Sequence, residues 1–344
     1  MRAVVIHAAR DLRIDEVATA APGPHEVRVR IEAGGICGSD LHYYQEGRIG
    51  TILLKEPMIL GHEIAGIVDQ VGPAVDNISP GDRVSVSPSR PCGHCRFCEA
   101  GQQIHCLDMR FYGSAMRMPH VHGAFRESLV ADARQCHVVP ASLSAAEAAM
   151  AEPLAVCLHA AHRAGPLLGR RVLVIGSGPI GALCVICARR AGAAEIVATD
   201  VADAPAETMR KVGVDRFLNV ASDPEALAEY SKDKGAFDVL MEASGNAQAL
   251  VSAFAAVRPG GVVVQVGIGS PAVIPLSVIV AKELELRGTF RFHEEFALAV
   301  TLLAKRLVDV RPLISATMPF TEARAAFELA GDRSRAMKVQ LAFS

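Results

Sequence analysis

The chain has 344 residues, of which 51% are hydrophobic and 21% are charged, with 35 Lys and Arg against 37 Asp and Glu. This length favours two domains over a single core, and the composition excludes a disordered chain. The net charge of −2 and the absence of Trp disfavour nucleic-acid binding, which relies on a basic surface and on aromatic stacking.

The N-terminal residues, MRAVVIHAARDLRIDE, carry charges throughout and therefore lack the apolar core of a signal peptide. The stretch 259–281 has no charged residue, but it contains prolines, glycines and serines. We interpret it as a buried strand followed by a turn, because a spanning helix would be interrupted at these positions. We therefore expect a cytoplasmic protein without membrane contact.

The first third of the chain contains short apolar runs separated by turns. Residues 27–31 and 82–86 alternate between apolar and polar side chains, and 64–71 is also strand-like. Gly-Pro and Pro-Gly pairs punctuate these runs, as is typical of turns. The pattern predicts a small, mostly β domain.

After about residue 144 the sequence becomes helical, and strands and helices alternate from residue 171 onward. The strands are predicted at 172–175, 195–199, 237–241 and 261–266. The helices are predicted at 179–191, 204–212 and 247–257. Apolar strands that alternate with helices indicate an α/β fold with a doubly wound parallel sheet covered on both faces. The C-terminal segment is mixed and could return to pack on the first domain.

A glycine-rich turn follows the strand predicted at 172–175. The sequence Gly176-Ser177-Gly178-Pro179-Ile180-Gly181 matches the Gly-x-Gly-x-x-Gly pattern of dinucleotide-binding domains. The three glycines would permit the tight turn, the approach of backbone N–H groups to a pyrophosphate, and close packing of the helix on the strand. Asp200 ends the next predicted strand, where it would bind ribose hydroxyls and repel a 2′-phosphate. We therefore expect NAD rather than NADP.

Four of the nine cysteines are crowded into one short segment: Cys92, Cys95, Cys98 and Cys106. Crowded thiols in a chain without an export signal indicate a metal rather than disulfides, and zinc prefers tetrahedral sulfur ligation. A site closed by four sulfurs has no open position for a substrate, so we expect this zinc to be structural. His94 or His105 could replace one of the cysteines.

Residues outside that segment indicate a second metal site. Cys37, His62, Glu63 and Glu152 offer sulfur, nitrogen and oxygen ligands. Mixed ligation with three protein ligands and one open position is typical of catalytic zinc. Cys37 could equally be a buried thiol and His62 a hydrogen-bonded core residue, and spacing alone does not choose between these interpretations.

Taken together, these motifs resemble the zinc-dependent medium-chain dehydrogenase/reductase superfamily over the whole chain. The segments that are similar to its polyol (sorbitol-type) branch are 37–43, 47–50 and 152–154. The segments that are similar to the L-idonate 5-dehydrogenases of that branch are 41–47, 108–116 and 288–292.

The resemblance implies a particular domain organisation and reaction. It implies a GroES-like catalytic domain at 1–150 and 289–344, with the structural zinc lobe at about 90–108, and a Rossmann domain at 151–288. It also implies two zinc ions per chain, one catalytic and one structural, together with NAD. The implied reaction is oxidation of L-idonate at C5 to 5-keto-D-gluconate, or the reverse.

The resemblance further assigns the metal ligands. Cys37, His62 and Glu152 match the family's ligands for the catalytic zinc. Glu63 matches a carboxylate that reaches the metal through water or only in some states. Which of the two carboxylates is the direct ligand stays open at this point.

The resemblance also assigns the residues that act on the substrate and the cofactor. Ser39 would accept the proton of the substrate alcohol, and His42 would pass it on toward water. The expected cofactor-binding residues are Gly176, Gly178, Pro179, Ile180, Gly181, Asp200, Gly267, Ile268, Phe290 and Arg291. The expected substrate-binding residues are Tyr43, Arg110, His120 and Arg291.

A sugar acid differs from a polyol by one carboxylate, for which a bidentate arginine is the best partner. Arg110 is the first candidate, followed by Arg117 and His120, although Arg110 could instead only hold the lobe in place. Most polyol relatives have a Tyr that helps to bind substrate directly after the position of Arg291. This chain has Phe292 there, which disfavours a neutral polyol such as sorbitol.

Several alternatives stay open. The chain could be a polyol dehydrogenase that acts on sorbitol or xylitol, a cofactor-binding protein without turnover, or a nucleic-acid-binding zinc ribbon, which the charge balance disfavours. His159 and His162, three residues apart on a predicted helix, could pair on a metal or pack in the interior. We expect a small-molecule substrate and, from apolar segments such as 273–280, a homo-oligomer (a dimer or a tetramer).

Overall fold

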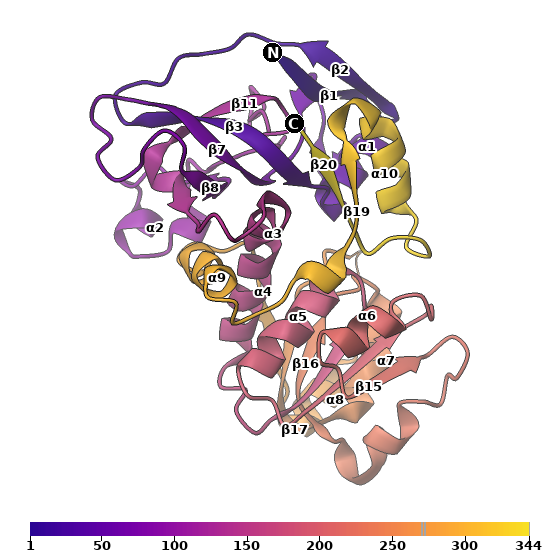
Figure 1. Ribbon diagram of the computed structural model, residues 1–344. Helices are drawn as coiled ribbons and strands as arrows, with labels where there is room; N and C mark the ends of the chain where they lie inside the picture. The colour runs from indigo at the N-terminus through magenta and orange to yellow at the C-terminus, as the bar shows by residue number, and fades with distance from the viewer. Residues whose placement is uncertain (270, 272, 344) are drawn as a thin grey trace.

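The computed structural model describes residues 1–269, 271 and 273–343, which form two halves of different architecture (Figure 1). The β-rich half contains the N- and C-terminal ends, and the other half is a parallel sheet flanked by helices. Helices α4 (Ala151–Ala164) and α9 (Glu295–Ala304) pack together where the halves meet. Over the described residues, every helix is too short or too polar to cross a membrane.

A seven-stranded sheet forms the centre of the β-rich half. Its order is β12-β8-β7-β3-β20-β19, with β11 paired to β3, and all pairs except β19 with β20 are antiparallel. The strands are β3 (Glu26–Gly35), β7 (Glu63–Val71), β8 (Arg83–Val86), β11 (Ser128–Asp132), β12 (Cys136–Val138), β19 (Ile314–Pro319) and β20 (Lys338–Ala342). The predicted alternation is confirmed in β3, because Val27, Val29 and Ile31 are buried while the intervening arginines lie on the other face.

Three smaller sheets complete this half. Their strands are β1 (Arg2–Ala8), β2 (Asp11–Glu16) and β6 (Met58–Ile59), then β4 (Arg48–Ile49) with β5 (Ile52–Leu53), and β9 (Ser89–Arg90) with β10 (Arg110–Phe111). The cysteine-rich segment is the connection between β9 and β10, so this short antiparallel pair closes the base of the lobe.

The other half contains a six-stranded, all-parallel sheet with the order β15-β14-β13-β16-β17-β18. The strands are β13 (Arg171–Ile175), β14 (Glu195–Asp200), β15 (Arg216–Asn219), β16 (Phe237–Glu242), β17 (Val257–Gln265) and β18 (Glu285–Gly288). In chain order this is the 3-2-1-4-5-6 arrangement of a Rossmann fold. The expected fold class, a Rossmann sheet with a mostly β GroES-like domain, is confirmed.

The remaining helices cover the sheets or support the loops between strands. They are α1 (Gly38–Glu46), α2 (Arg96–Glu99), α3 (Ala145–Ala149), α5 (Pro179–Arg190), α6 (Ala206–Lys211), α7 (Ala247–Ala253), α8 (Leu276–Lys282) and α10 (Ala323–Gly331). The α5 helix packs against α4, and α10 packs against β20, so each half has its own helical cover.

Most elements of the Rossmann half lie where the sequence predicts them, with three differences. The helix predicted at 247–257 ends at Ala253, because residues 254–256 form a 3-10 turn and β17 begins at Val257. The stretch 259–281, interpreted as a strand followed by a turn, begins within β17 but ends in helix α8. The hydrophobic pattern also does not predict β15 and β18, which are short outer strands with charged side chains, as is typical of sheet edges.

A buried carboxylate ties α4 to α9. Glu295 Oε1 accepts hydrogen bonds from Nδ1 of His159 at 2.8 Å and of His162 at 3.0 Å. Burial raises the pKa of Glu295, but hydrogen bonds, chiefly from His159, outweigh this and hold the pKa at about 2. The two histidines therefore bind a carboxylate of the fold, and the metal-type clusters among the described residues lie elsewhere.

The C-terminal segment belongs to both halves. Helix α9 and Leu313 pack into the core of the Rossmann half, whereas β19 and β20 join the main sheet of the β-rich half. The chain thus rejoins the first sheet from Ile314 onward, and the domain limits at residues 150 and 289 stay a prediction.

Candidate active site

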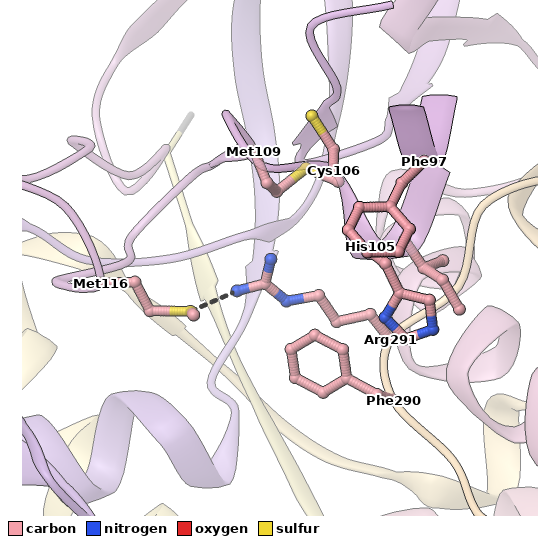
Figure 2. A pocket seen from close by; sticks show the side chains of 8 residues that line it. Phe97, His105, Cys106, Met109, Met116, Phe290 and Arg291 are labelled. Carbon is pink, nitrogen blue, oxygen red and sulfur yellow. Dashed lines mark hydrogen bonds between the residues drawn. The ribbon is translucent and has the colours of Figure 1, made fainter. Parts of the chain in front are cut away.

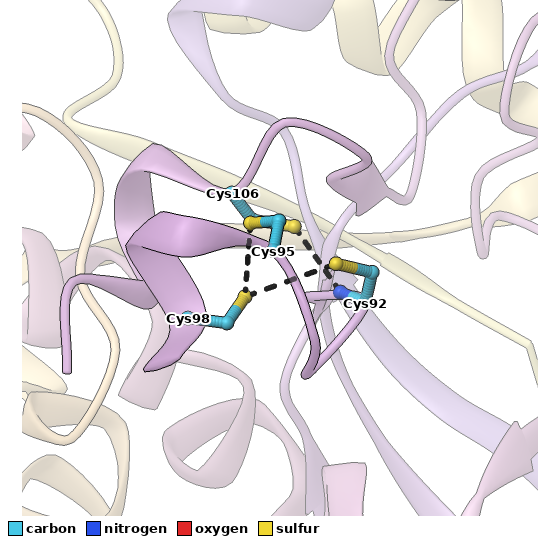
Figure 3. Close-up of side chains that lie close together, drawn as sticks. All are labelled: Cys92, Cys95, Cys98 and Cys106. Atoms are coloured by element: carbon cyan, nitrogen blue, oxygen red, sulfur yellow. Dashed lines mark hydrogen bonds between the residues drawn. The ribbon is translucent and has the colours of Figure 1, made fainter. Parts of the chain in front are cut away.

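The four predicted lobe cysteines converge on one point (Figure 3). The sulfur of Cys98 lies 3.6 Å from that of Cys95 and 4.0 Å from that of Cys92, and all four sulfurs lie within 4.8 Å of one another. A tetrahedron with metal–sulfur bonds of about 2.3 Å has edges of about 3.8 Å. The spacing of the thiols therefore fits one zinc ion.

The surroundings act differently on the individual lobe cysteines. The backbone N–H groups of Cys92 and Asp108 point to the sulfur of Cys106, at 3.1 and 3.3 Å. A hydrogen bond from the N–H of Leu107 lowers the pKa of Cys95 to about 6, while desolvation raises that of Cys98 to about 12. The ring of His94 binds the carbonyl of Cys92, so His94 gains no support as a metal ligand.

A second donor cluster lies where β3 ends and β7 begins, in the middle of the main sheet of the β-rich half. Sulfur, nitrogen and oxygen atoms of Cys37, His62 and Glu63 lie within 4.8 Å of one another. Cys37 precedes α1, and the other two residues lead into β7, which pairs with β3. His62 Nδ1 is buried and has no hydrogen-bond partner among the described residues. Such a buried, mixed donor set fits a zinc ion.

Glu63 is held by a buried lysine from the far end of the chain. The Lys338 ammonium lies 2.6 Å from Oε1 and 2.5 Å from Oε2 of Glu63, and it also donates to the carbonyl of Ile36 at 3.0 Å. A side chain at Gly35 would meet Glu63, since a Cβ there would lie 2.1 Å from Oε2. Glu63 therefore has a permanent cationic partner within the fold.

Glu152 lies beside this cluster, in the first turn of α4, but outside the group of closest donors. Its carboxylate is buried and has no hydrogen-bond partner among the described residues. Burial raises the pKa of Glu152 to about 8. The charge of His62 lowers this pKa, whereas the charges of Glu63 and Cys37 raise it. Buried carboxylates without a partner are commonly compensated by a cation, so Glu152 also fits a metal ligand.

Asp40 connects the two loops that supply the donors. Its carboxylate is fully buried, accepts the N–H of Cys37 at 3.0 Å and the N–H of Gly61 at 3.1 Å, and lies 3.8 Å from Nδ1 of His62. It thereby fixes the relative position of Cys37 and His62. Carboxylates that orient a metal-binding histidine in this way are common in metal sites.

We expect Asp40→Ala to destabilise the fold by at least about 2 kcal/mol, because two buried N–H groups would lose their acceptor. Urea unfolding would measure the change. Asp69→Ala is a matched control, since Asp69 forms a partly exposed ion pair with Arg28 and such pairs contribute about 1 kcal/mol or less. Equal unfolding midpoints for the two variants would contradict the bridging role of Asp40.

The glycine-rich turn lies between β13 and α5, as predicted. Gly176 has a positive φ of 86°, and a Cβ at Gly181 would lie 1.8 Å from the carbonyl oxygen of Gly176. In contrast, a Cβ at Gly178 would meet no protein atom within 4 Å. Pro179 and Ile180 begin α5, whose N-terminus offers unpaired N–H groups. The turn thus leaves space for a ligand beside Gly178, as pyrophosphate binding requires.

Asp200 lies next to this turn. Its carboxylate accepts the N–H of Ser177 at 2.8 Å and the N–H groups of Val201 and Ala202 at 2.8 and 3.1 Å. These bonds hold the carboxylate at the carboxyl end of β14, where dinucleotides bind in Rossmann folds.

The residues expected near the nicotinamide follow β17 and β18. A Cβ at Gly267 would lie 2.3 Å from the nitrogen of Gly245, so this position tolerates only glycine. Ile268 and Phe290 are 76% and 42% exposed, which is unusual for side chains of this size. Both lie at the carboxyl edge of the parallel sheet, on the same side as the glycine-rich turn.

The expected proton-relay residues lie on α1. Burial raises the pKa of the Cys37 thiol to about 11, and the side chain of Ser39 acts to lower it. Half-exposed His42 lies 3.5 Å from a carboxylate oxygen of Glu46. Residues three apart share one face of a helix, so Ser39 and His42 lead from the donor cluster toward solvent. Tyr43 is buried, and its hydroxyl accepts the N–H of Ala115 at 3.0 Å.

The three first candidates for binding a carboxylate lie in different settings. Arg110 is exposed on β10. Arg117 forms an ion pair with Asp108. His120 is buried, its Nε2 accepts the N–H of Lys55 at 2.9 Å, and its Nδ1 bonds the carbonyl of Arg117 at 2.7 Å, so both ring nitrogens are occupied.

Arg291 lies in a hollow of about 500 Å³ between the lobe and the segment after β18 (Figure 2). Its guanidinium lies over the rings of Phe111 and Phe290, at 4.2 and 4.9 Å from their centroids. Burial lowers the pKa of Arg291 to about 10, a value at which the side chain is still charged near neutral pH.

Comparison with known proteins agrees with this geometry. The model of the alcohol dehydrogenase GroES-like domain matches residues 23–141, and that of zinc-binding dehydrogenases matches 179–305. L-idonate 5-dehydrogenase (NAD(P)(+)) of Escherichia coli K12 is 44% identical over 92% of this chain and 91% of its own length. Sorbitol dehydrogenase of Gallus gallus is 36% identical over 98% and 95%. The chain belongs to the polyol branch of the zinc-dependent medium-chain dehydrogenases.

The fold of this medium-chain dehydrogenase is also that of a solved relative. The crystal structure of L-idonate 5-dehydrogenase from Escherichia coli K-12 superposes with a TM-score of 0.95 and 41% identity, covering 99% of this chain and 97% of that one. The predicted enzyme class is confirmed, so the chain is an NAD(P)-dependent alcohol oxidoreductase.

Sequence reasoning did not assign three residues of this dehydrogenase's site: Asp40, Lys338 and Phe111. The role of Asp40 could have been predicted, since it is the third residue of a helix that begins after Cys37 and forms a capping box there. No sequence pattern predicts the role of Lys338, because 275 residues separate it from Glu63. Phe111, whose ring lies 5.5 Å from that of His62, looks like any core aromatic in the sequence.

Proposed function

We propose that this dehydrogenase oxidises L-idonate at C5 to 5-keto-D-gluconate, reversibly and with NAD. The assignment of this substrate rests on one observation: over nine-tenths of its length the chain is similar to a protein named L-idonate 5-dehydrogenase. The buried Phe292 adds support, because it packs on Phe296 with centroids 5.6 Å apart and offers no hydroxyl to a neutral polyol.

We further propose two zinc sites per chain. The structural zinc is held by Cys92, Cys95, Cys98 and Cys106. The catalytic zinc is held by Cys37, His62 and Glu152, because Glu63 already has Lys338 as its partner while Glu152 has none. In this arrangement Glu63 lies in the same cluster, beside the metal, but is not its direct ligand.

The chain's own residues bind and orient the reactants. Zinc at this donor set would lower the pKa of the substrate hydroxyl, and NAD would accept the hydride from C5. Ser39 accepts the hydroxyl proton and His42 passes it along the exposed face of α1 to water. Tyr43 lines the substrate side, and the turn at Gly178 binds the pyrophosphate.

The cofactor preference rests on Asp200. Its carboxylate, fixed by the N–H of Ser177, would accept hydrogen bonds from the ribose hydroxyls and repel a 2′-phosphate. The name of the Escherichia coli relative covers both NAD and NADP, so the strength of this preference is part of the test below.

A polyol dehydrogenase is the second candidate function. The similarity to the Gallus gallus sorbitol dehydrogenase over almost the whole chain favours it. The two functions differ in whether the preferred substrate carries a carboxylate.

A substrate panel distinguishes these functions. We expect kcat/KM for L-idonate to exceed those for L-iditol, sorbitol and xylitol, with NAD preferred to NADP, in assays of NAD(P)H absorbance. Metal analysis of the same sample should give two zinc ions per chain, and a strong chelator should abolish turnover. Higher kcat/KM for a neutral polyol would instead establish the second candidate.

Two broader properties are also proposed. All nine cysteines are free thiols, which agrees with a cytoplasmic location. Val273, Leu276 and Val280 are 93%, 70% and 76% exposed, which agrees with a homo-oligomer, either a dimer or a tetramer, that buries them.

A further inference from the structure

Glu242 is a buried carboxylate at the point where the strand order of the parallel sheet reverses. It is the last residue of β16, and it pairs in register with Ile175, the last residue of β13. The two halves of the sheet run outward from these neighbouring strands, and dinucleotides bind outside the carboxyl ends of the strands at such a point. Glu242 is fully buried, so hydrogen-bond donors must compensate its carboxylate.

Two loops at the carboxyl edge of the sheet bring these donors together. From the loop after β16, the N–H groups of Ser244 and Gly245 donate to Oε1 at 2.7 and 2.9 Å, as does the hydroxyl of Ser244. From the end of β17, the side-chain amide of Gln265 donates to Oε2 of Glu242 at 2.6 Å and to the carbonyl of Gly267 at 2.8 Å. The carboxylate therefore joins the loop after β16 to the loop after β17.

The same two loops are in backbone contact with each other and with the glycine-rich turn. A Cβ at Gly267 would lie 2.8 Å from Oε2 of Glu242, and a Cβ at Gly269 would lie 2.2 Å from the carbonyl oxygen of Gly245. A Cβ at Gly176, in the glycine-rich turn, would lie 2.8 Å from the backbone nitrogen of Ser244. A shift of the loop after β16 would therefore also displace the segments expected to contact the pyrophosphate and the nicotinamide.

We propose that Glu242 is a positioning residue of the cofactor site, which holds the loops after β16 and β17 in the conformation that binds the nicotinamide dinucleotide. Both of its carboxylate oxygens are occupied by donors from these loops, so it acts through them rather than on the reacting atoms. The inference requires a nicotinamide cofactor, as this enzyme class uses, and no particular substrate.

The test measures cofactor binding directly, by following NADH fluorescence while NADH is titrated into the enzyme. Glu242→Gln keeps the size of the side chain but brings amide hydrogens toward groups that are themselves donors. We expect this variant to raise the Kd of NADH and the KM of NAD by roughly 10-fold, because buried hydrogen bonds are lost. The kcat at saturating NAD should not fall, since Cys37, His62 and Glu63 lie in the other half of the molecule.

Asp238→Asn is the matched control. Asp238 lies near the amino end of the same strand and accepts the N–H of Arg171 at 2.8 Å. It also forms ion pairs with Arg170 and Arg258. Both variants should lower the midpoint of urea unfolding, whereas only Glu242→Gln should raise the Kd of NADH. An unchanged Kd in Glu242→Gln, or an equal rise in Asp238→Asn, would overturn the positioning role of Glu242.

Gln265→Met is the second variant, and it decides the question if Glu242→Gln yields no folded protein. It removes the link from β17 and leaves the N–H bonds from the loop after β16 in place, so we expect a smaller rise of the Kd, about threefold. An unchanged Kd in this variant would overturn the proposal. NADH binding is measured without a sugar substrate, so this result is independent of whether the enzyme oxidises L-idonate.

Discussion

Replacing His62 by alanine is expected to lower kcat/KM for L-idonate by about 10³-fold and to remove about one zinc ion per chain. His62 supplies the single nitrogen of the buried donor cluster, and a bound metal contributes several kcal/mol of transition-state stabilisation, where each 1.4 kcal/mol is tenfold in rate. Steady-state kinetics and elemental analysis of one preparation would measure both effects.

His94→Ala is the control for this experiment. His94 is exposed on the lobe and its ring binds a backbone carbonyl, so the variant should keep its zinc content and its activity. A His62→Ala enzyme with full turnover, or a wild-type enzyme that is fully active after verified loss of zinc, would contradict the proposed catalytic site.

Lys338→Met is expected to destabilise the protein by about 3–5 kcal/mol, the usual result of removing one partner of a buried ion pair. Lys338 and Glu63 are 3% and 1% exposed, so solvent would not compensate the carboxylate that is left behind. Removing the lysine also deprives the carbonyl of Ile36 of its donor. The midpoint of urea unfolding would measure the loss.

The double variant Lys338→Met/Glu63→Gln separates the loss of charge pairing from the loss of lysine packing. Neutralising Glu63 should recover most of the stability that Lys338→Met alone removes, because no unpaired charge then remains. If the double variant were as unstable as the single one, the ion pair would not be the source of the effect.

Much of the fold and half of the site follow from short stretches of sequence. Alternation in 27–31 and apolar runs such as 172–175 identify strands because burial acts on every second residue or on whole strands. The glycine-rich turn and the four lobe cysteines can also be identified from the sequence. The members of each motif lie within one short segment, so local geometry alone brings them together.

Other parts of the site depend on residues that are far apart in the chain. The sequence leaves open whether Glu63 or Glu152 is the direct ligand. In the structure, Lys338 on β20 gives Glu63 a cationic partner and leaves Glu152 without one. In the same way, the sequence offers Arg110, Arg117 and His120 as partners for a substrate carboxylate. The structure exposes Arg110 on β10, pairs Arg117 with Asp108 and occupies both ring nitrogens of His120.

The sequence by itself determined most of the strands and helices of the Rossmann half, the dinucleotide turn, the thiol lobe and the types of donor atom available for catalysis. Only the tertiary structure decided which carboxylate is already paired and which aspartate fixes the donor loops. The physical reason is the distance along the chain over which each signal acts. Hydrophobic periodicity and motif spacing act over a few residues. Ion pairing, desolvation and ring stacking depend instead on distances between side chains that only folding brings together.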